Sequence, residues 1–313
     1  APTPLPTTQA REQTPTAQAF STPAPSIPSP AGTLAVPVFD ARQRTYSVWL
    51  VNADGTNLRK VVDEASTPAL SIDGSMLAYR NWQRDDRGIV VARSDGADPL
   101  RITDKLEDVL PSFSPDGTKV ALSSYRWGDR KNRLYYAWTD NQDQIAWEWG
   151  EGGIYGEDPF WMANGRILYR VTRRDTEAEE LWSMSSVDGQ DRLLLYSANS
   201  IRAPAAAFNS RWVTFMAADN GNWDIYIIDT STSAVRRLTT HEANDGLPVW
   251  SPDGRYIAFV SDREGQWGIW TMHADGTNQQ LLTRLPGSVD GTVEFEMEYL
   301  TNGWLEEQIA WSR

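Results

Sequence analysis

Tight-turn dipeptides recur along this chain at a spacing of roughly 45 residues, and no other feature limits its fold as strongly. One series comprises Asp73-Gly74, Asp116-Gly117, Asn164-Gly165, Asn209-Ser210, Asp253-Gly254 and Asn302-Gly303. A second series lies between its members and comprises Asp54-Gly55, Asp95-Gly96, Asp140-Asn141, Asp188-Gly189, Thr230-Ser231 and Asp275-Gly276. Asp-Gly and Asn-Gly accept the positive φ angles of hairpin turns, so each dipeptide predicts two short strands that fold back on each other. Two hairpins per repeat indicate six four-stranded antiparallel units.

The segments between these turns have the composition of strands. Residues 256–260 read Tyr-Ile-Ala-Phe-Val and residues 268–272 read Gly-Ile-Trp-Thr-Met, both rich in β-branched and aromatic side chains. Helical periodicity is essentially absent, which excludes βαβ units and a parallel sheet. Repeats of this length with four strands each are typical of propeller blades. We therefore expect an all-β, six-bladed β-propeller over residues 34–313.

The repeat also carries a recognisable signature. Residues 247–259 (LPVWSPDGRYIAF) and 269–278 (IWTMHADGTN) resemble the repeat of TolB-like propellers, a WD-repeat-like family, and residues 114–122 and 49–57 match it again. The resemblance extends over residues 34–313, with a degraded signature in blade three at 138–141 and in blade five at 208–210. It implies the same fold that the turn spacing predicts.

The resemblance implies less about function. TolB pairs its propeller with an N-terminal α/β domain that these residues do not include, so the resemblance does not carry over the periplasmic role of TolB. Similar propellers gate serine peptidases, whose hydrolase domain needs a Gly-x-Ser-x-Gly elbow, and no such sequence occurs in this chain. We expect a protein that is not an enzyme, with no catalytic residues and no cofactor.

The phase of the two turn series predicts that one blade is shared between the N- and C-terminal ends. Such closure removes the strand edges that an open arc would expose. Residues 34–39 and 308–312 can both be read as the second strand of that blade, so one strand is in excess. Either Ile309 and Trp311 lie in the innermost strand, with residues 293–300 as an inserted hairpin, or a strand is exchanged between copies.

Residues 1–33 differ in composition from the rest and are expected to form an extended arm. Eight prolines alternate there with Thr, Ser and Ala, and only Arg11 and Glu12 are charged. This composition favours polyproline II or a disordered spacer, and it resembles stalks that are O-glycosylated outside the cell. At roughly 3.1 Å per residue the arm could reach a neighbouring copy. The apolar residues expected to anchor such an assembly arm are Leu5, Phe20, Ile27, Leu34, Val36 and Val38.

Charge and cysteine content exclude several classes of function. The chain has 29 basic and 42 acidic residues and a net charge of -13, which argues against nucleic acid or an anionic membrane as partner. It has no cysteine, so it has no disulfide and no thiolate. No apolar run is long enough to span a membrane. The first residues, Ala1-Pro2-Thr3, lack an initiator Met, which indicates that a signal peptide has been removed and that the protein is secreted or at the cell surface, although an artificial start would look the same.

Few residues suggest a metal site. His241 and His273 are the only histidines, too few for a histidine-based metal centre. Asp219 and Asp224 lie in an oxygen-rich segment that could hold calcium, but it does not match an EF-hand loop. Ordinary turn chemistry explains this segment better, so we predict no metal and keep the two aspartates as weak calcium candidates.

A second set of candidates lies at the connections between the second and third strands of blades two to four. These residues are Arg84, Arg87, Arg126, Trp127, Arg130, Arg173 and Arg174. In an antiparallel blade these connections share one face of the ring, which we call the loop face, with the acidic blade-to-blade loops. Such mixed charge suits either a protein interface or pairing within the chain. Trp82, Trp127 and Trp223 lie in or near loops, where exposed indoles could stack on a sugar.

The sequence thus favours a non-enzymatic, extracytoplasmic protein-binding or assembly module. Its sharpest version is a self-assembling, filament-type subunit that is linked to its copies through the N-terminal arm. The alternative is a propeller that binds a small ligand, a carbohydrate or a cation at its central channel or loop face.

Overall fold

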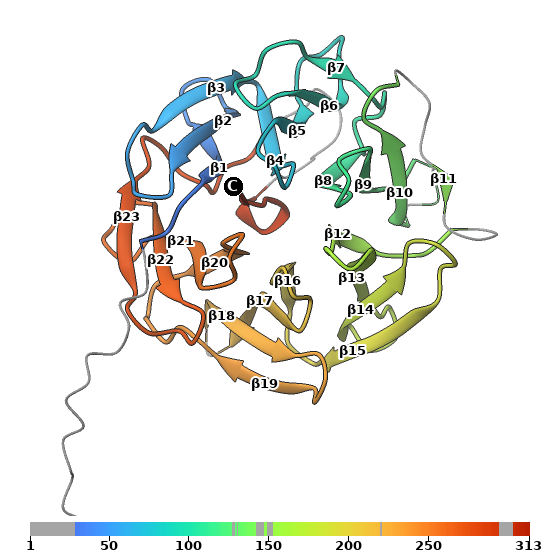
Figure 1. Cartoon of the computed structure of the whole chain (residues 1–313), viewed down its shortest axis with the longest axis vertical. Helices are drawn as coiled ribbons and strands as arrows, with labels where there is room; N and C mark the ends of the chain where they lie inside the picture. Colours follow the sequence, from blue (N-terminus) through green and yellow to red (C-terminus); the bar gives the residue numbers. More distant parts are fainter. Residues whose placement is uncertain are drawn as a thin grey trace, which may run out of the picture.

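The computed structural model describes residues 29–126, 129, 131–141, 147–148, 153–219, 221–293 and 303–313. Six four-stranded antiparallel sheets are arranged radially around a central channel (Figure 1). This architecture confirms the all-β, six-bladed propeller that the turn spacing predicts. Among the described residues the single helical element is the 3-10 turn η1 (Trp304–Glu306). No described helix is long and apolar enough to cross a membrane.

Each blade runs from an innermost strand at the channel to an outermost strand at the rim. The first three blades, in this order of strands, are β24 (Ala310–Ser312), β1 (Thr33–Asp40), β2 (Thr45–Asn52) and β3 (Arg59–Asp63); β4 (Ala65–Leu70), β5 (Met76–Asn81), β6 (Gly88–Arg93) and β7 (Leu100–Arg101); and β8 (Val109–Phe113), β9 (Lys119–Ser124), β10 (Arg133–Trp138) and β11 (Trp147–Glu148).

The last three blades follow the same order, and each is built from four consecutive strands. They are β12 (Glu157–Trp161), β13 (Arg166–Thr172), β14 (Glu179–Ser185) and β15 (Asp191–Ser197); β16 (Ile201–Ala206), β17 (Trp212–Asp219), β18 (Asn222–Asp229) and β19 (Ala234–Arg237); and β20 (Asp245–Trp250), β21 (Tyr256–Ser261), β22 (Gly268–His273) and β23 (Gln280–Arg284).

The predicted hairpin turns lie between the expected strands, with one exception. The Asp-Gly turns close through a repeated side-chain contact, in which the hydroxyl of Ser114 donates to Asp116 at 2.7 Å and that of Ser251 to Asp253 at 2.6 Å. The glycine after each of these aspartates has φ near 70°, a conformation that glycine adopts without steric cost. The sixth member of the first series was wrongly predicted as a hairpin, because Gly303 precedes η1 instead of a strand.

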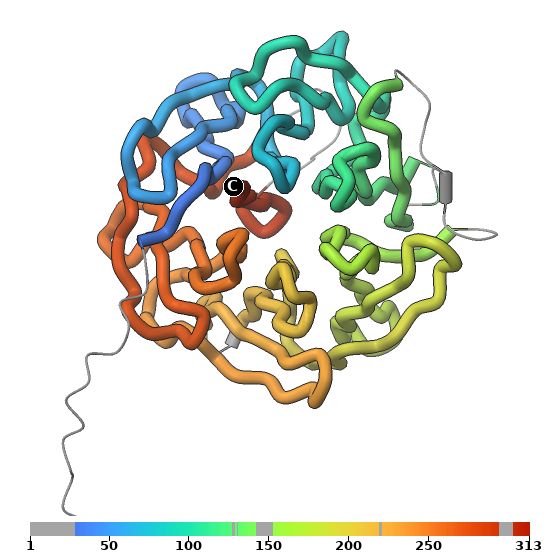
Figure 2. Tube along the Cα trace, in the orientation of Figure 1, coloured from blue at the N-terminus to red at the C-terminus, as the bar shows by residue number. Residues whose placement is uncertain are grey.

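Ring closure joins the two ends of the described chain in one sheet. Strand β24 pairs with β1 through Thr33↔Ser312, Leu34↔Trp311 and Ala35↔Ala310. Figure 2 shows the blue first strand beside the dark red C-terminal segment, which lies inside the ring. The innermost strand of the shared blade therefore comes from the C-terminal end of the same chain. The inserted hairpin expected at 293–300 lies outside the described residues except for Val293.

The core lies between neighbouring blades. Its largest cluster joins the closing, fifth and sixth blades through buried side chains such as Leu34, Ile227 and Phe259. Leu34, Val36 and Val38, which the sequence suggested as part of the assembly arm, belong to β1 and are at most 4% exposed. These three residues pack inside their own ring, whereas Leu5, Phe20 and Ile27 lie outside the described residues.

Gly32 offers a direct test of ring closure. It has φ +106°, and a Cβ there would lie 1.9 Å from the carbonyl oxygen of Ser312 in β24. Gly189 is a matched control, since it has φ +70° and open space around a Cβ. We expect Gly189→Ala to cost about 1–2 kcal/mol of unfolding free energy from backbone strain alone, and Gly32→Ala to cost at least about 2 kcal/mol more. Urea unfolding of both variants measures the difference, and equal losses would contradict the described closure.

Candidate functional site

The channel is lined by a repeated backbone irregularity. In each of β4, β8, β12, β16 and β20 the pairing register shifts at a bulge, and a residue with positive φ precedes a proline there. The five pairs are Thr67-Pro68, Leu110-Pro111, Asp158-Pro159, Ala203-Pro204 and Leu247-Pro248. Proline cannot donate to a strand ladder and is tolerated at such bulges. The innermost strands thus bend at one level of the channel in five of six blades.

The innermost strand of the closing blade has no such bulge among its described residues, and the side chain of Gln308 lies at this level of the channel instead. Gln308, just before β24, donates from Nε2 to the carbonyl oxygens of Thr67, Pro68 and Pro111 at 3.3, 3.2 and 2.7 Å. One side-chain amide therefore donates hydrogen bonds to backbone carbonyl groups of two other blades. The C-terminal segment crosses the channel at this point and divides it into two ends.

The end on the side of the first-hairpin turns, which we call the turn face, opens into an apolar cavity of about 150 Å³. Six aromatic side chains and four prolines contribute to its wall, and none of its described lining residues is charged. Ile72 and Phe208 stand at its rim and are 36% and 49% exposed. We call this cavity the channel mouth. It offers apolar and aromatic surface rather than acid–base chemistry.

The C-terminal segment 304–309, which we call the plug, lies in the channel on the other side of this crossing. Trp304 is buried and packs against Trp267 at 5.3 Å and Trp223 at 6.1 Å between ring centroids. Space for this indole exists because residue 246 is glycine, where a Cβ would lie 2.2 Å from the Trp304 ring. The plug therefore depends on a specific small residue in β20, and η1 lies in the centre of the ring in Figure 1.

Glu307 is the buried ionisable group of the plug. It is 1% exposed, and its Oε2 accepts a hydrogen bond from the backbone N–H of Thr67 at 2.8 Å. Burial raises the pKa of its carboxyl group to about 8, against the lowering effects of this hydrogen bond and of Arg80. Arg80 is itself buried, lies 3.9 Å from the Trp82 ring centroid and donates to the carbonyl of Leu106. Trp82 is 4% exposed, so its indole is not available to stack on a sugar.

The loop-face arginines divide into internal and exposed residues. Arg126 is 9% exposed at its side chain and forms two hydrogen bonds, at 2.7 and 2.6 Å, with Asp108, which is fully buried. Arg84 is exposed and Arg87 is half-buried. Trp127 and Arg130 lie outside the described residues. Arg126 thus pairs within the chain, the alternative that the sequence left open.

Arg173 and Arg174 are exposed and lie at a cleft of about 730 Å³ between blades three and four. Arg173 pairs with Glu180 at 2.9 Å. Lys131 and Tyr155 line the same cleft, together with Glu157 and Asp175, so the charge there is mixed. This cleft is a second candidate surface on the loop face.

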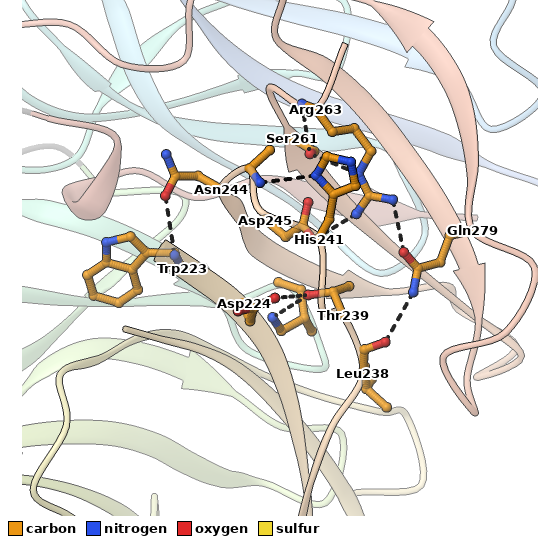
Figure 3. Close-up of polar contacts among 12 residues, drawn as sticks. Trp223, Asp224, Leu238, Thr239, His241, Asn244, Asp245, Ser261, Arg263 and Gln279 are labelled. Carbon is orange, nitrogen blue, oxygen red and sulfur yellow. Dashed lines mark hydrogen bonds and ion pairs between the residues drawn. The ribbon is translucent and has the colours of Figure 1, made fainter. Parts of the chain in front are cut away.

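The weak calcium candidate Asp224 is engaged by other side chains. It is fully buried in β18, where Arg237 pairs with it and the hydroxyl of Thr239 donates to it at 3.1 Å (Figure 3). Burial raises the pKa of Asp224, opposed by the same two partners. The side chain of Asp219 is not among those described. No group of three or more His, Cys, Asp or Glu side chains that could hold a metal occurs in the described part of the chain.

Known proteins with a similar sequence or fold share this propeller architecture. The model of the TolB beta propeller domain matches residues 197–295. The Tol-Pal system protein TolB of Gluconobacter oxydans is 25% identical over 338 residues, covering 80% of this chain and 72% of that protein. The crystal structure of TolB from Acinetobacter baumannii superposes with a TM-score of 0.70 at 18% identity, covering 90% of this chain and 66% of that one.

Other relatives match this chain over only part of their own length. An uncharacterized peptidase of Bacillus subtilis, YuxL, is 22% identical over 192 residues, covering 49% of this chain and 29% of the peptidase. The chain spans 57% of another curated relative. The fold and its plugged channel define a six-bladed β-propeller that is closed by strands from both ends of the chain. More particularly, residues 197–295 match the TolB beta propeller domain, and the ring as a whole has the fold of the TolB propeller.

The sequence missed the channel mouth and the plug, although one signal for them was present. The prolines at 68, 111, 159, 204 and 248 recur with the same spacing as the turns. That recurrence indicates a shared place in the blade, but it does not reveal that Pro68 and Pro111 line the mouth while Pro159, Pro204 and Pro248 lie beside the plug.

Glu307 predicts a pH dependence of stability. The folded state raises its pKa from the ordinary value to about 8, so the stability that neutral Glu307 provides is complete in acid and is lost as the pH rises through about 8. Between the ordinary pKa of 4.5 and the raised pKa of about 8, the free energy of unfolding falls by up to about 1.4 kcal/mol per pH unit. Glu307→Gln keeps a neutral side chain, and we expect its urea midpoint to equal that of the wild type near pH 4.5 and to exceed it at pH 8.5. A wild-type advantage at pH 8.5 would show that ionised Glu307 stabilises the plug.

The two kinds of loop-face arginine predict different mutational costs. Arg126→Ala leaves the carboxylate of Asp108 buried without its guanidinium, which costs about 3–5 kcal/mol for pairs of this kind. Arg173→Ala removes an exposed guanidinium from the buried Glu180, which keeps the hydrogen bond from the Trp182 indole at 2.9 Å. We therefore expect a smaller loss of unfolding free energy than in Arg126→Ala. Urea unfolding at neutral pH measures both values. A loss below 1 kcal/mol in Arg126→Ala would mean that water replaces the pair.

Proposed function

We propose that this chain is a non-enzymatic, extracytoplasmic protein-binding module and that its N-terminal arm links it to further copies as an assembly subunit. The TolB-like propeller fold supports a protein-interaction role. An extracytoplasmic location is supported by the similarity to TolB proteins, which are periplasmic, and by the Pro/Ser/Thr-rich composition of residues 1–33.

One observation carries the proposal. The channel mouth is an uncharged, aromatic-lined cavity in a chain of net charge -13. Protein-interaction sites are distinguished by depletion of charge and enrichment of aromatic side chains at their centre. The mouth has both properties, and its exposed rim residues, Ile72 and Phe208, are accessible to a partner.

The same site argues against catalysis. A hydrolytic or acid–base site needs ionisable groups within hydrogen-bond distance of a substrate. No charged residue or histidine is among the described residues that line the mouth. The hydroxyls of Ser114 and Ser251, which do line it, are engaged by the turn carboxylates of Asp116 and Asp253. The buried charges elsewhere on the ring, such as Asp108 and Asp224, are held in ion pairs.

Light scattering of the full-length chain and of a chain that starts at Ser29 tests the arm. The shorter chain keeps Ala31 and Gly32, which bond to Trp311 and Ala53 in the ring. We expect the full-length chain to form dimers or larger species at concentrations where the shorter chain is monomeric. The triple variant Leu5→Ser, Phe20→Ser, Ile27→Ser has the full length and should behave like the shorter chain. If all three proteins have the same oligomeric state, the assembly role is wrong.

A further inference from the structure

The channel mouth has the chemistry of a polyproline receptor. Its wall includes Phe113, Phe160, Trp161, Phe208, Trp250 and Trp311. Proline-rich segments in the polyproline II conformation dock in aromatic-lined grooves, because the preformed helix loses little entropy on binding. The volume of about 150 Å³ admits one or two apolar side chains rather than a folded domain. The mouth therefore fits an extended, proline-bearing segment.

This chain itself contains such a segment, and the described residue Ala31, which follows it, contacts the wall of the mouth. The indole Nε1 of Trp311, which lines the mouth, donates to the carbonyl of Ala31 at 3.0 Å. Residues 1–28 precede this point, and their last six residues are Pro23-Ala24-Pro25-Ser26-Ile27-Pro28. The segment thus joins the ring at a residue that forms part of the cavity wall.

The length of the segment permits docking on either its own ring or another one. Ile27 is four residues from Ala31, or roughly 12 Å along a polyproline helix, and Phe20 is eleven residues away, or roughly 34 Å. A tethered segment has an effective concentration in the millimolar range. The mouth of the same ring is therefore within reach of Ile27, and a neighbouring ring is within reach of Phe20 and Leu5.

Charge complements this fit. The ring is strongly acidic, but residues 1–28 carry one basic and one acidic side chain, Arg11 and Glu12. The described lining of the mouth is uncharged. Contact between the two is not opposed by the charge of the ring, and it should depend little on salt.

We propose that the channel mouth is the docking site for residues 1–28 of this chain, held through their proline and apolar side chains. This inference rests on the proposed function to the extent that it takes the arm to be a binding element. It adds the receptor: the turn face of the ring, with Ile72 and Phe208 as rim contacts. It also makes the mouth available to another partner only when the arm has left it.

The test uses the chain that starts at Ser29 and a synthetic peptide of residues 1–28 with a fluorophore at its N-terminus. Fluorescence anisotropy measures the dissociation constant of this peptide. We expect binding that Phe208→Gln and Ile72→Gln each weaken by about tenfold, the effect of losing an important apolar contact. Both residues are exposed, so the variants should keep the melting temperature of the parent chain, which is measured alongside.

Two matched controls distinguish binding at the mouth from non-specific hydrophobic binding. Val187 is 93% exposed and does not line the mouth, so Val187→Gln should leave the affinity unchanged. A peptide with Phe20→Gln and Ile27→Gln should bind at least about tenfold more weakly than the native peptide. Raising the NaCl concentration should change the dissociation constant of the native peptide by no more than about twofold.

The outcomes also separate this inference from the proposed assembly role. Binding that is equal in the parent, Phe208→Gln and Ile72→Gln chains overturns the mouth as receptor while the arm remains a binding element. No binding at millimolar peptide overturns the inference. If the peptide binds the mouth of the shorter chain but the full-length chain is a monomer that excludes it, the inference holds with the arm on its own ring, and the assembly role fails.

Discussion

Pairing of β24 with β1 is the contact on which the rest of the ring depends. Five blades are built from consecutive strands, so their hairpins need only local turns, whereas the closing blade joins Thr33 to Ser312. Closing a loop of this length costs on the order of 5 kcal/mol of chain entropy. Burial of a large apolar side chain contributes about 1.5–3 kcal/mol, and the C-terminal segment buries Trp304, Ile309 and Trp311. Closure is favourable because this segment inserts side chains into the ring as well as adding a short strand.

The plug shows how the same segment shapes the channel. Gln308 bonds to the bulged backbone of β4 and β8, and Glu307 bonds to Thr67 in β4. These contacts fix the depth at which the C-terminal segment crosses the channel. What lies on the turn-face side of that crossing is the mouth, so ring closure and the candidate site are built from one stretch of chain. Loss of the plug would alter both.

The sequence predicted what local chemistry determines and missed what distant residues determine together. Asp253-Gly254 and its counterparts fix hairpins through their own φ angles and serine contacts, so blade number and strand order could be predicted. Arg126 could not be assigned, because its partner Asp108 is 18 residues away and the sequence does not show that both are buried. The mouth combines residues from all six blades. Asn302-Gly303 misled for the converse reason, since its sequence suits a turn but the segment after it closes the ring.

The distribution of charge explains why the two faces of the ring differ as binding surfaces. On the loop face, buried carboxylates need arginine partners, and Asp108 and Glu179 are paired with Arg126 and Arg170. A partner docking there must compete with, or leave intact, contacts that stabilise the fold. At the turn-face mouth no described lining residue is ionised, so a partner displaces water from apolar surface without breaking an ion pair. The association that we propose at the mouth would therefore be governed by the hydrophobic effect, which favours an apolar segment with little charge of its own.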